Sequence, residues 1–299
     1  MPKYRKPLPA ELPEPEIIDL EALAADLRSG AVELVCVLGP TASGKTKYAV
    51  RLARELAGKG LEAEIISADS RQVYRGMDIG TGKDLAEYEE IPYHLIDIRE
   101  AGTQYNVYDF VKDFRVAYAD IRARGKVAIL CGGTGLYINA VTAGYDFRSS
   151  KPLSQPADSG RLSVARSGGG HSATATHGPA QKTSVTATTP GTDIPRTYFI
   201  GTLVSREVRN SRIDARLRAR LQEGMVDEIR GLLAGGVPAE TLIGYGLEYK
   251  FVTLYLQGQL DEQELFEKLS TAIHQFAKRQ MTWFRGMERS GVKIHWIEV

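Results

Sequence analysis

The sequence predicts an α/β protein in which a parallel sheet carries a phosphate-binding loop and is flanked by helices. One observation is the alternation of strand and helix patterns through the first half of the chain. The other is a buried-strand pattern at residues 33–38 that leads directly into a glycine-rich octapeptide, behind which apolar residues recur at helical spacing. Alternation of this kind is typical of parallel sheets that are covered by helices.

The octapeptide matches the pattern G-x-x-x-x-G-K-[ST] of phosphate-binding loops. It reads Gly39-Pro40-Thr41-Ala42-Ser43-Gly44-Lys45-Thr46. In such a loop the backbone N–H groups and the N-terminus of the following helix surround an anion. The Lys45 ammonium adds a positive charge, and the Thr46 hydroxyl is placed to hold Mg²⁺. A glycine-rich turn without a ligand is the alternative, which the flanking strand and helix patterns disfavour.

Three more strands are expected in the first half, because short apolar runs there end at polar or glycine-rich turns. They cover residues 63–67, 93–98 and 126–131. An amphipathic helix is expected over residues 107–124. Ligands bind at the carboxyl ends of the strands in parallel sheets. Thr46, Asp69 and Thr134 each follow a strand, so we expect them to meet at one edge of the sheet.

The second half is expected to be mainly helical. A strand over residues 198–204 precedes a long helical pattern from about residue 206 to 233. A turn at residues 244–249 leads into another helix, and residues 262–287 carry apolar side chains at the spacing of a core-facing helix. Residues 292–297 are expected to form a final short strand.

Residues 151–195 interrupt this pattern. They are dominated by Ser, Thr, Ala, Gly and Pro and contain no aromatic residue. Such a segment cannot bury enough apolar surface to offset its ordering entropy, so we expect it to be disordered. The chain would then comprise an N-terminal extension (1–32), a P-loop core (33–150), this insertion, and a part (196–299) that continues the core and ends in a basic helical region.

The composition favours a soluble protein of the cytoplasm. The 299 residues are 43% hydrophobic and 25% charged, with a net charge of only +1, so any basic surface must be local. Cys36 and Cys131 lie in apolar runs, where core residues are expected rather than a disulfide or a metal site. The histidines show no metal-ligand spacing. No run of 18 apolar residues occurs, so no membrane span is expected.

Five further motifs follow the loop in order. They are Ser67-Ala68-Asp69-Ser70-Arg71-Gln72-Val73-Tyr74, Gly80-Thr81-Gly82-Lys83, His94-Leu95-Ile96-Asp97, Gly132-Gly133-Thr134-Gly135-Leu136-Tyr137 and Lys278-Arg279-Gln280-Met281-Thr282-Trp283-Phe284-Arg285. This set resembles the tRNA dimethylallyltransferases, which prenylate the exocyclic amine of the adenosine beside the anticodon. The resemblance covers about residues 33–147 and 197–297. In that family a helical insertion with a Gln-Arg-x-x-Arg motif grips the anticodon arm, and residues 151–195 contain neither.

The resemblance implies transfer of a dimethylallyl group from dimethylallyl diphosphate to adenosine 37 of tRNA, with release of pyrophosphate and with Mg²⁺ as cofactor. Lys45, Thr46 and the loop amides would take the negative charge that develops on the leaving group. By motif alignment, Arg216 matches an arginine that contacts the pyrophosphate. A solvated helix face is the alternative for Arg216 and its neighbouring arginines.

The resemblance also implies a set of residues on the tRNA side. They are Asp69, Ser70, Arg71, Gln72, Thr134, Lys278, Arg279 and Arg285. Asp69 matches the catalytic aspartate that takes a proton from the amine. A role of Asp69 as a Mg²⁺ ligand or as a helix cap is the alternative. Gln72 has the side-chain type that commonly reads an adenine edge, and Thr134 would line the pocket. Arg71 and Lys83 would each meet a phosphate or stay solvated.

Basic residues near the end of the last long helix suit contacts with a nucleic-acid backbone. Lys278, Arg279 and Arg285 are interleaved there with Trp283 and Phe284. A helix C-terminus also attracts cations without any ligand, which is the alternative.

Three other functions remain open from the sequence. A P-loop kinase or NTPase would use the same loop, but no apolar strand ends in the paired acids that would position a metal and water. An adenylate isopentenyltransferase acting on free adenine nucleotides would share nearly all of the motifs. An inactive RNA-binding relative is the third alternative, and the set of Lys45, Thr46 and Asp69 speaks against it. We expect a monomer.

Overall fold

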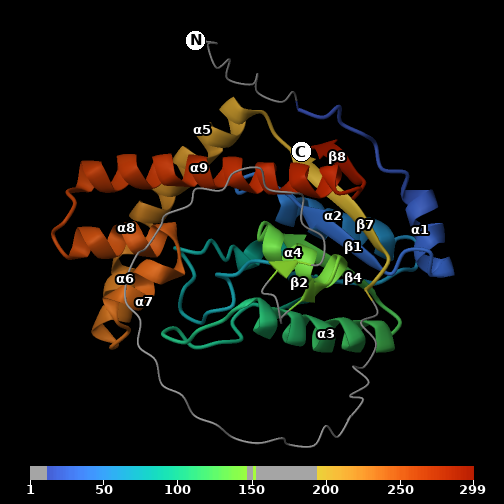
Figure 1. Ribbon diagram of the computed structural model, residues 1–299, viewed down its shortest axis with the longest axis horizontal. Coiled ribbons are helices and arrows are strands. Elements are labelled where there is room, and N and C mark those ends of the chain that lie inside the picture. The colour runs from blue at the N-terminus through green and yellow to red at the C-terminus, as the bar shows by residue number, and fades with distance from the viewer. Residues whose placement is uncertain (1–11, 147–150, 153–193) are drawn as a thin grey trace, which may run out of the picture.

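A parallel six-stranded sheet with the strand order β3-β2-β4-β1-β7-β8 forms the centre of the protein (Figure 1). The computed structural model describes residues 12–146, 151–152 and 194–299. The strands are β1 (Leu34–Leu38), β2 (Ala63–Ser67), β3 (Tyr93–His94), β4 (Val127–Gly132), β7 (Thr197–Leu203) and β8 (Ile294–Glu298), and a separate antiparallel pair joins β5 (Tyr145–Asp146) to β6 (Lys151–Pro152). The α/β fold class predicted from the sequence is therefore confirmed.

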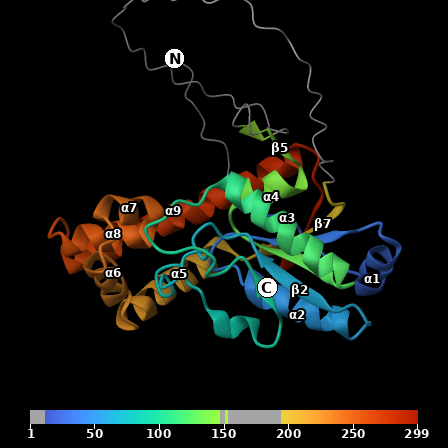
Figure 2. The same cartoon turned by 90° about the horizontal axis from the view of Figure 1, so that it is seen from below.

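Helices cover both faces of the sheet and form a separate helical part. They are α1 (Leu20–Ser29), α2 (Lys45–Ala57), α3 (Val107–Ala123), α4 (Gly135–Thr142), α5 (Arg206–Gln222), α6 (Met225–Ala234), α7 (Ala239–Tyr245), α8 (Leu247–Leu256) and α9 (Glu262–Arg289), with a short 3₁₀ helix at Leu85–Tyr88. One core joins the sheet to α3, α4 and the end of α9, through residues such as Phe110, Tyr137 and Phe284. A second core joins the opposite face to α1 and α2 (Figure 2).

A third core lies within the helical part. Buried residues of α5 to α9 pack there against Val73, Tyr74 and Met77, which belong to the segment after β2. The long α9 contributes to this core with Leu265, and to the core on the sheet with Phe284. Helix α9 therefore ties the helical part to the sheet, and the segment after β2 passes between them.

The third strand is shorter than the 93–98 predicted from its apolar pattern. Only Tyr93–His94 pairs with β2, because Leu95 and Asp97 adopt positive φ angles of 64° and 55°. Such left-handed residues interrupt the extended backbone that a ladder requires. The Asp97 N–H instead donates to the Gln72 carbonyl at 3.1 Å, which brings this segment beside the one that follows β2.

The helix predicted over 206–233 is two helices. Gly224 takes a left-handed φ of 105° between α5 and α6, so the chain changes direction there. The turn predicted at 244–249 holds the end of α7, then Gly246, then the start of α8. Helices α1, α4 and α7 were not expected. Each is ten residues or shorter, and so carries little periodicity.

The predicted disorder of residues 151–195 falls largely outside the described part of the chain. Lys151–Pro152 forms β6, and residues 194 and 195 lead into β7. Residues 153–193 lie outside the described residues, so their predicted disorder stays a prediction. Among the described residues no helix is long and apolar enough to cross a membrane. Cys36 and Cys131 are buried free thiols, as expected.

Glu64, in the middle of β2, is a buried carboxylate that we expect to control acid stability. Arg124 donates to both carboxylate oxygens, and His94 and Lys126 lie at 2.8 and 3.0 Å from them. The hydrogen bonds of Arg124, opposed by burial and assisted by His94 and Lys126, lower the pKa of Glu64 from 4.5 to about 2. Glu64 therefore adds stability above pH 4.5, and this stability is lost as the pH falls through about 2.

Replacing Glu64→Gln should cost about 3 kcal/mol of unfolding free energy at pH 7, which is the depressed pKa expressed as energy. The difference in unfolding free energy between the two proteins should shrink as the pH falls from 4.5, because the stability that the ionised Glu64 contributes is lost there. Urea unfolding at several pH values between 7 and 3 would measure both effects. Asp120→Asn, which removes the exposed second partner of Arg124, is the control and should change stability little. Parallel pH curves for Glu64→Gln and the unsubstituted protein would contradict the assignment.

Candidate active site

A cavity of about 1050 Å³ opens at the carboxyl edge of the sheet, between the phosphate-binding loop and the helical part. Most of the site residues predicted from the sequence line it. They are Thr41, Ala42, Gly44, Lys45, Thr46, Asp69, Ser70, Arg71, Gln72, Thr134, Arg216 and Arg279. The expected meeting of Thr46, Asp69 and Thr134 is therefore observed. Gly39, Pro40, Ser43, Lys278 and Arg285 lie outside its lining.

The phosphate-binding loop is held in an anion-binding shape by contacts with β7 and α9. Ala42 and Gly44 have positive φ angles of 60° and 80°, which wrap the backbone over the start of α2. The buried hydroxyl of Ser43 lies 2.6 Å from the Thr202 hydroxyl. The Thr41 N–H donates to Gln280 Oε1 at 2.8 Å. Within the loop, Ser43 thus supports the structure, while Thr41, Ala42 and Gly44 face the cavity.

Lys45 and Thr46 begin α2 at the bottom of the cavity, where the helix dipole favours an anion. Burial lowers the pKa of Lys45, against coulombic effects of Cys131 and Asp69 in the opposite direction. Within the described part of the chain Lys45 forms no ion pair, so its charge is available to a ligand. Burial raises the pKa of Cys131 to about 12, which keeps this thiol neutral beside Lys45 and Thr46.

Asp69 stands at the end of β2 in a turn that fixes its orientation. Its Oδ1 accepts a hydrogen bond from the Arg71 N–H at 2.8 Å, and its carboxylate lines the cavity. The Ser70 N–H donates to Thr134 Oγ1 at 3.2 Å, which joins this turn to the start of α4. The turns after β2 and β4 therefore form one surface, on which Asp69 and Thr134 face the same space.

Gln72, from the segment after β2, and Arg216, from α5, both line the cavity and share one acceptor. The Gly82 carbonyl accepts from Gln72 Nε2 at 3.3 Å and from Arg216 Nη2 at 3.4 Å. Gln72 Oε1 also accepts from Ser67, and Arg216 pairs with Asp84 at 2.6 Å. The Gln72 amide thus already has intramolecular partners, and its role in reading a base stays a prediction.

Several cavity residues were not selected from the sequence. Gln280 of α9 bridges the Thr41 N–H and the Gly133 carbonyl, to which it donates at 3.0 Å. Arg212 and Arg220 flank Arg216 on the same side of α5, and Glu248 of α8 faces them. Burial lowers the pKa of Arg220 and raises that of Glu248. The spacing of four residues from Arg212 to Arg216 to Arg220 was the available signal, since it places all three on one helix face.

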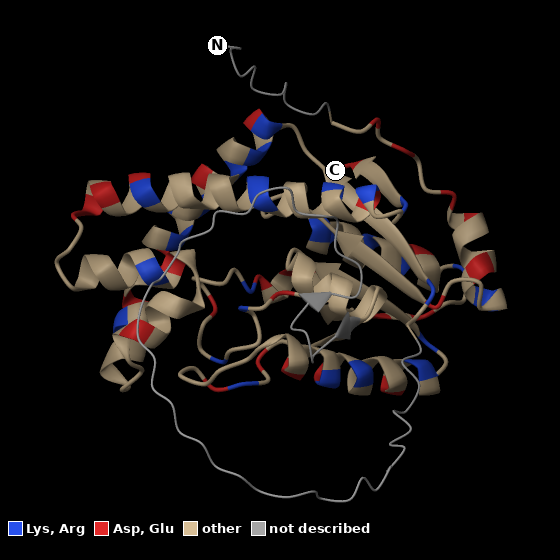
Figure 3. Cartoon of the chain, in the orientation of Figure 1, with Lys and Arg blue, Asp and Glu red and all other residues tan. Residues whose placement is uncertain are grey.

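The predicted basic residues of α9 have different surroundings. Arg279 lines the cavity beside the half-exposed rings of Phe276 and Trp283, whereas Lys278 is exposed outside it. Arg285 pairs with Glu288 at 3.0 Å and lies over the Trp296 ring. Figure 3 shows basic residues along both α5 and α9. Contacts of Lys278 and Arg285 with nucleic acid stay predictions, and of these three residues only Arg279 faces the cavity.

Lys83 is neither a phosphate ligand nor a solvated residue, so both roles expected for it from the sequence are wrong. Its side chain is fully buried and donates to the Tyr74 carbonyl, to Asp78 at 2.9 Å and to Asp97. Two carboxylates and a carbonyl therefore hold this ammonium inside the protein, and a diphosphate has no access to it.

The fold and the cavity define a P-loop protein with an anion site and a carboxylate at the same edge of the sheet. The family model described as IPP transferase matches residues 72–175 and 162–287, and the chain belongs to this family. It is 51% identical to the tRNA dimethylallyltransferase 2 of Porphyromonas gingivalis, over 89% of this chain and 93% of that protein. It is 48% identical to the tRNA dimethylallyltransferase 1 of Parabacteroides distasonis, over 89% and 92%.

Solved structures agree with this assignment. The crystal structure of the tRNA isopentenylpyrophosphate transferase from Bacillus halodurans is similar with a TM-score of 0.67 and 28% sequence identity, over 89% of each chain. The corresponding protein from Staphylococcus epidermidis gives a TM-score of 0.64 and 25% identity, over 89% of this chain and 92% of that one. The resemblance that the motifs indicated is therefore confirmed.

Proposed function

We propose that this protein transfers a dimethylallyl group from dimethylallyl diphosphate to the exocyclic amine of adenosine 37 in tRNA. The observation that carries the proposal is the presence of Lys45, Asp69 and Arg216 in the lining of one cavity. This arrangement supplies positive charge for a leaving diphosphate and a carboxylate for the attacking amine. The relatives named tRNA dimethylallyltransferases support the same reaction.

The donor would bind with its diphosphate against the loop and the start of α2. Cleavage of the carbon–oxygen bond builds negative charge on the pyrophosphate, so groups placed to meet this charge lower the barrier. Lys45 has no ion pair within the described part of the chain, and Arg216 reaches the cavity from α5. The half-exposed Phe276 and Trp283 offer apolar surface to the dimethylallyl chain.

Mg²⁺ fits this site as a partner of the donor rather than as a separate metal centre. Among the described residues, no group of three or more His, Cys, Asp or Glu is arranged to hold a metal. Mg²⁺ is commonly held by one or two protein oxygens together with substrate phosphates. The Thr46 hydroxyl in the cavity would be the protein ligand, and the bound ion would neutralise charge on the pyrophosphate.

The acceptor adenine must leave its stack to reach the cavity, at a cost of about a few kcal/mol that a fitted pocket repays. Its amine is a weak nucleophile because the lone pair is delocalised into the ring. Asp69 would take the amine proton as the new carbon–nitrogen bond forms. Thr134 and Gln72 would line the base pocket, and Ser70, Arg71 and Arg279 stand at the same cavity. We also propose that the protein is a monomer and that it works in the cytoplasm, where tRNA is modified.

Incubation with labelled dimethylallyl diphosphate, Mg²⁺ and either an anticodon stem-loop or adenosine monophosphate would test the proposal. We expect a higher kcat/KM for the stem-loop, since the basic residues of α9 add contacts that a mononucleotide lacks. ATP hydrolysis should be negligible. A higher kcat/KM for adenosine monophosphate would favour an adenylate isopentenyltransferase, and robust ATP turnover would contradict the donor assignment.

A further inference from the structure

The loop of residues 77–83 forms part of the cavity wall and is anchored from two sides. Gly80, Thr81 and Gly82 line the cavity. The loop lies outside every helix and strand, so its shape depends on side chains that come from other elements. Glu228 of α6 accepts three hydrogen bonds from the loop, and Lys83, which belongs to the loop itself, anchors it to the segments beside it.

Glu228 of α6 binds the loop as an internal anion. Its Oε2 accepts from the N–H groups of Asp78 and Ile79, both at 2.7 Å, and its Oε1 accepts from the Gly80 N–H at 3.1 Å. Successive N–H groups that converge in this way form an anion-binding nest. The Tyr249 hydroxyl donates to Oε1 at 2.7 Å. The side chain of Glu228 thus connects α6 and α8 to the cavity wall.

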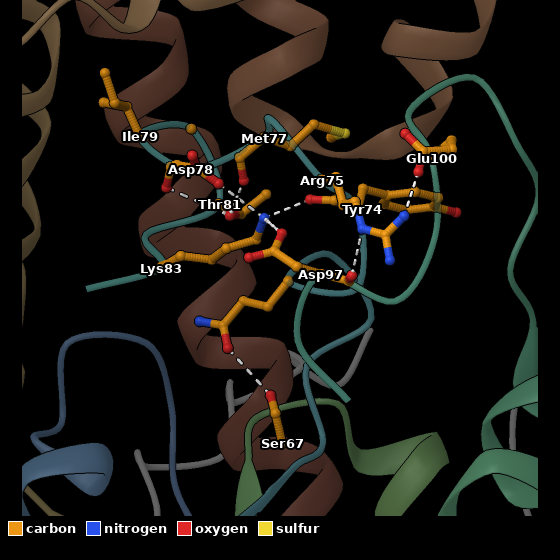
Figure 4. Close-up of polar contacts among 12 residues, drawn as sticks. Ser67, Tyr74, Arg75, Met77, Asp78, Ile79, Thr81, Lys83, Asp97 and Glu100 are labelled. Atoms are coloured by element: carbon orange, nitrogen blue, oxygen red, sulfur yellow. Dashed lines mark hydrogen bonds and ion pairs between the residues drawn. The ribbon is translucent and has the colours of Figure 1, made fainter. Parts of the chain in front are cut away.

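Lys83 holds the other side of the loop against the segments that follow β2 and β3. Figure 4 shows its ammonium between Asp78, Asp97 and the Tyr74 carbonyl. Asp78 is contacted from both sides, because its N–H faces Glu228 and its carboxylate faces Lys83. The loop therefore has little freedom to move toward or away from the cavity.

The fixed loop in turn supports Arg216. The Gly82 carbonyl and the Asp84 carboxylate both accept from Arg216 Nη2, at 3.4 and 2.6 Å. A Cβ atom at Gly82 would lie 2.6 Å from Arg216 Nη2 and 1.6 Å from Arg220 Nη2, so the two guanidinium groups pack directly on this glycine. Gly80 is also closely packed, since its Cβ would lie 2.8 Å from the Tyr249 ring. A displacement of the loop would shift the surface on which Arg216 rests.

We propose that Glu228 is a positioning residue, which holds the loop 77–83 in place and thereby sets Arg216 for the pyrophosphate. This inference rests on the proposed function for the part that Arg216 plays at the donor. Glu228 itself lies behind the loop and does not line the cavity. Its effect on the cavity must therefore pass through the groups that it binds, which are the N–H groups of the loop and the Tyr249 hydroxyl.

The test is a double-mutant cycle between Glu228→Gln and Arg216→Ala, with the affinity for inorganic pyrophosphate in the presence of Mg²⁺ as the readout. Glutamine keeps one acceptor oxygen but places an NH₂ group against donors, so the loop loses part of its anchor. We expect Glu228→Gln to weaken pyrophosphate binding about tenfold, the scale of one charged hydrogen bond. In the Arg216→Ala background the same change should have little further effect, because residues that act as a unit are not additive.

Asp227→Asn is the matched control, since it removes a charge from the neighbouring, exposed position of α6. It should leave pyrophosphate affinity unchanged. Additive effects of Glu228→Gln and Arg216→Ala, or an unchanged affinity in Glu228→Gln, would overturn the inference. If the stem-loop and adenosine monophosphate both failed as acceptors while the coupling was observed, only the proposed function would fall.

A second measurement does not depend on any variant folding. In the unsubstituted protein, the amide hydrogens of Asp78, Ile79 and Gly80 should exchange slowly although they belong to a loop, because each donates to Glu228. The amide of Gly76, another loop glycine nearby, is the internal comparison. Exchange of the three amides as fast as that of Gly76 would also overturn the inference.

Discussion

Asp69→Asn should lower kcat for prenyl transfer by about two to four orders of magnitude, the usual contribution of a general base. Asparagine has nearly the same shape, and its Oδ1 can still accept the hydrogen bond from the Arg71 N–H that now measures 2.8 Å. The turn after β2 should therefore persist, and only the proton acceptor is lost. Single-turnover kinetics with saturating donor and tRNA would measure the chemical step directly.

The affinity for dimethylallyl diphosphate distinguishes a base from a metal ligand at this position. If Asp69 acts on the amine, donor affinity in Asp69→Asn should stay within about twofold, because the change removes an interaction made in the transition state. Glu87→Gln is the control, since it removes another carboxylate from the cavity wall, one that lies 3.7 Å from the exposed Lys47 ammonium. Equal losses of donor affinity and kcat in Asp69→Asn would indicate a Mg²⁺ ligand instead.

The sheet was predictable from the sequence because its strands are buried on both sides. Residues 63–67 match β2 at both ends, since all five positions are buried and a polar turn follows. The strand predicted over residues 93–98 was too long. The side chains of Leu95 and Ile96 are buried in the cores, although the backbone of these residues does not pair with β2. The break at Gly224 was missed because the helical spacing continues across it, and only the backbone angle shows the change of direction.

Motifs located the cavity, but they did not reveal how its walls are supported. Lys45 and Asp69 were identifiable because each follows a strand within a recognisable pattern. Lys83 was misjudged, since its two carboxylate partners come from the loop beside it and from a segment fourteen residues away. Glu228 is 148 residues from Gly80, and no local pattern relates them. Roles that depend on such distant contacts appear only once the chain is folded.

Lys45→Ala should lower kcat/KM for dimethylallyl diphosphate by about two to three orders of magnitude. This is comparable to the loss of one hydrogen-bond donor to a developing oxyanion. The change removes a charge that has no ion pair in the described part of the chain, so no internal carboxylate is left unpaired. Lys45→Ala should therefore reduce catalytic activity without lowering the stability of the folded protein. Donor binding and turnover, measured at saturating tRNA, would give the size of the effect.

The pH dependence of kcat/KM tests whether Lys45 acts in its charged form. Burial lowers the pKa of Lys45 from 10.5, so kcat/KM should fall as the pH rises through that lowered value, because the ammonium is the active form. This alkaline limb should disappear in Lys45→Ala and move upward in Lys45→Arg, since a guanidinium stays charged throughout. Arg51→Ala, which removes an exposed charge from the same helix, should leave both the rate and the limb unchanged. If the alkaline limb persisted in Lys45→Ala, it would arise from another titrating group. That result would contradict the proposal that the Lys45 ammonium binds the pyrophosphate.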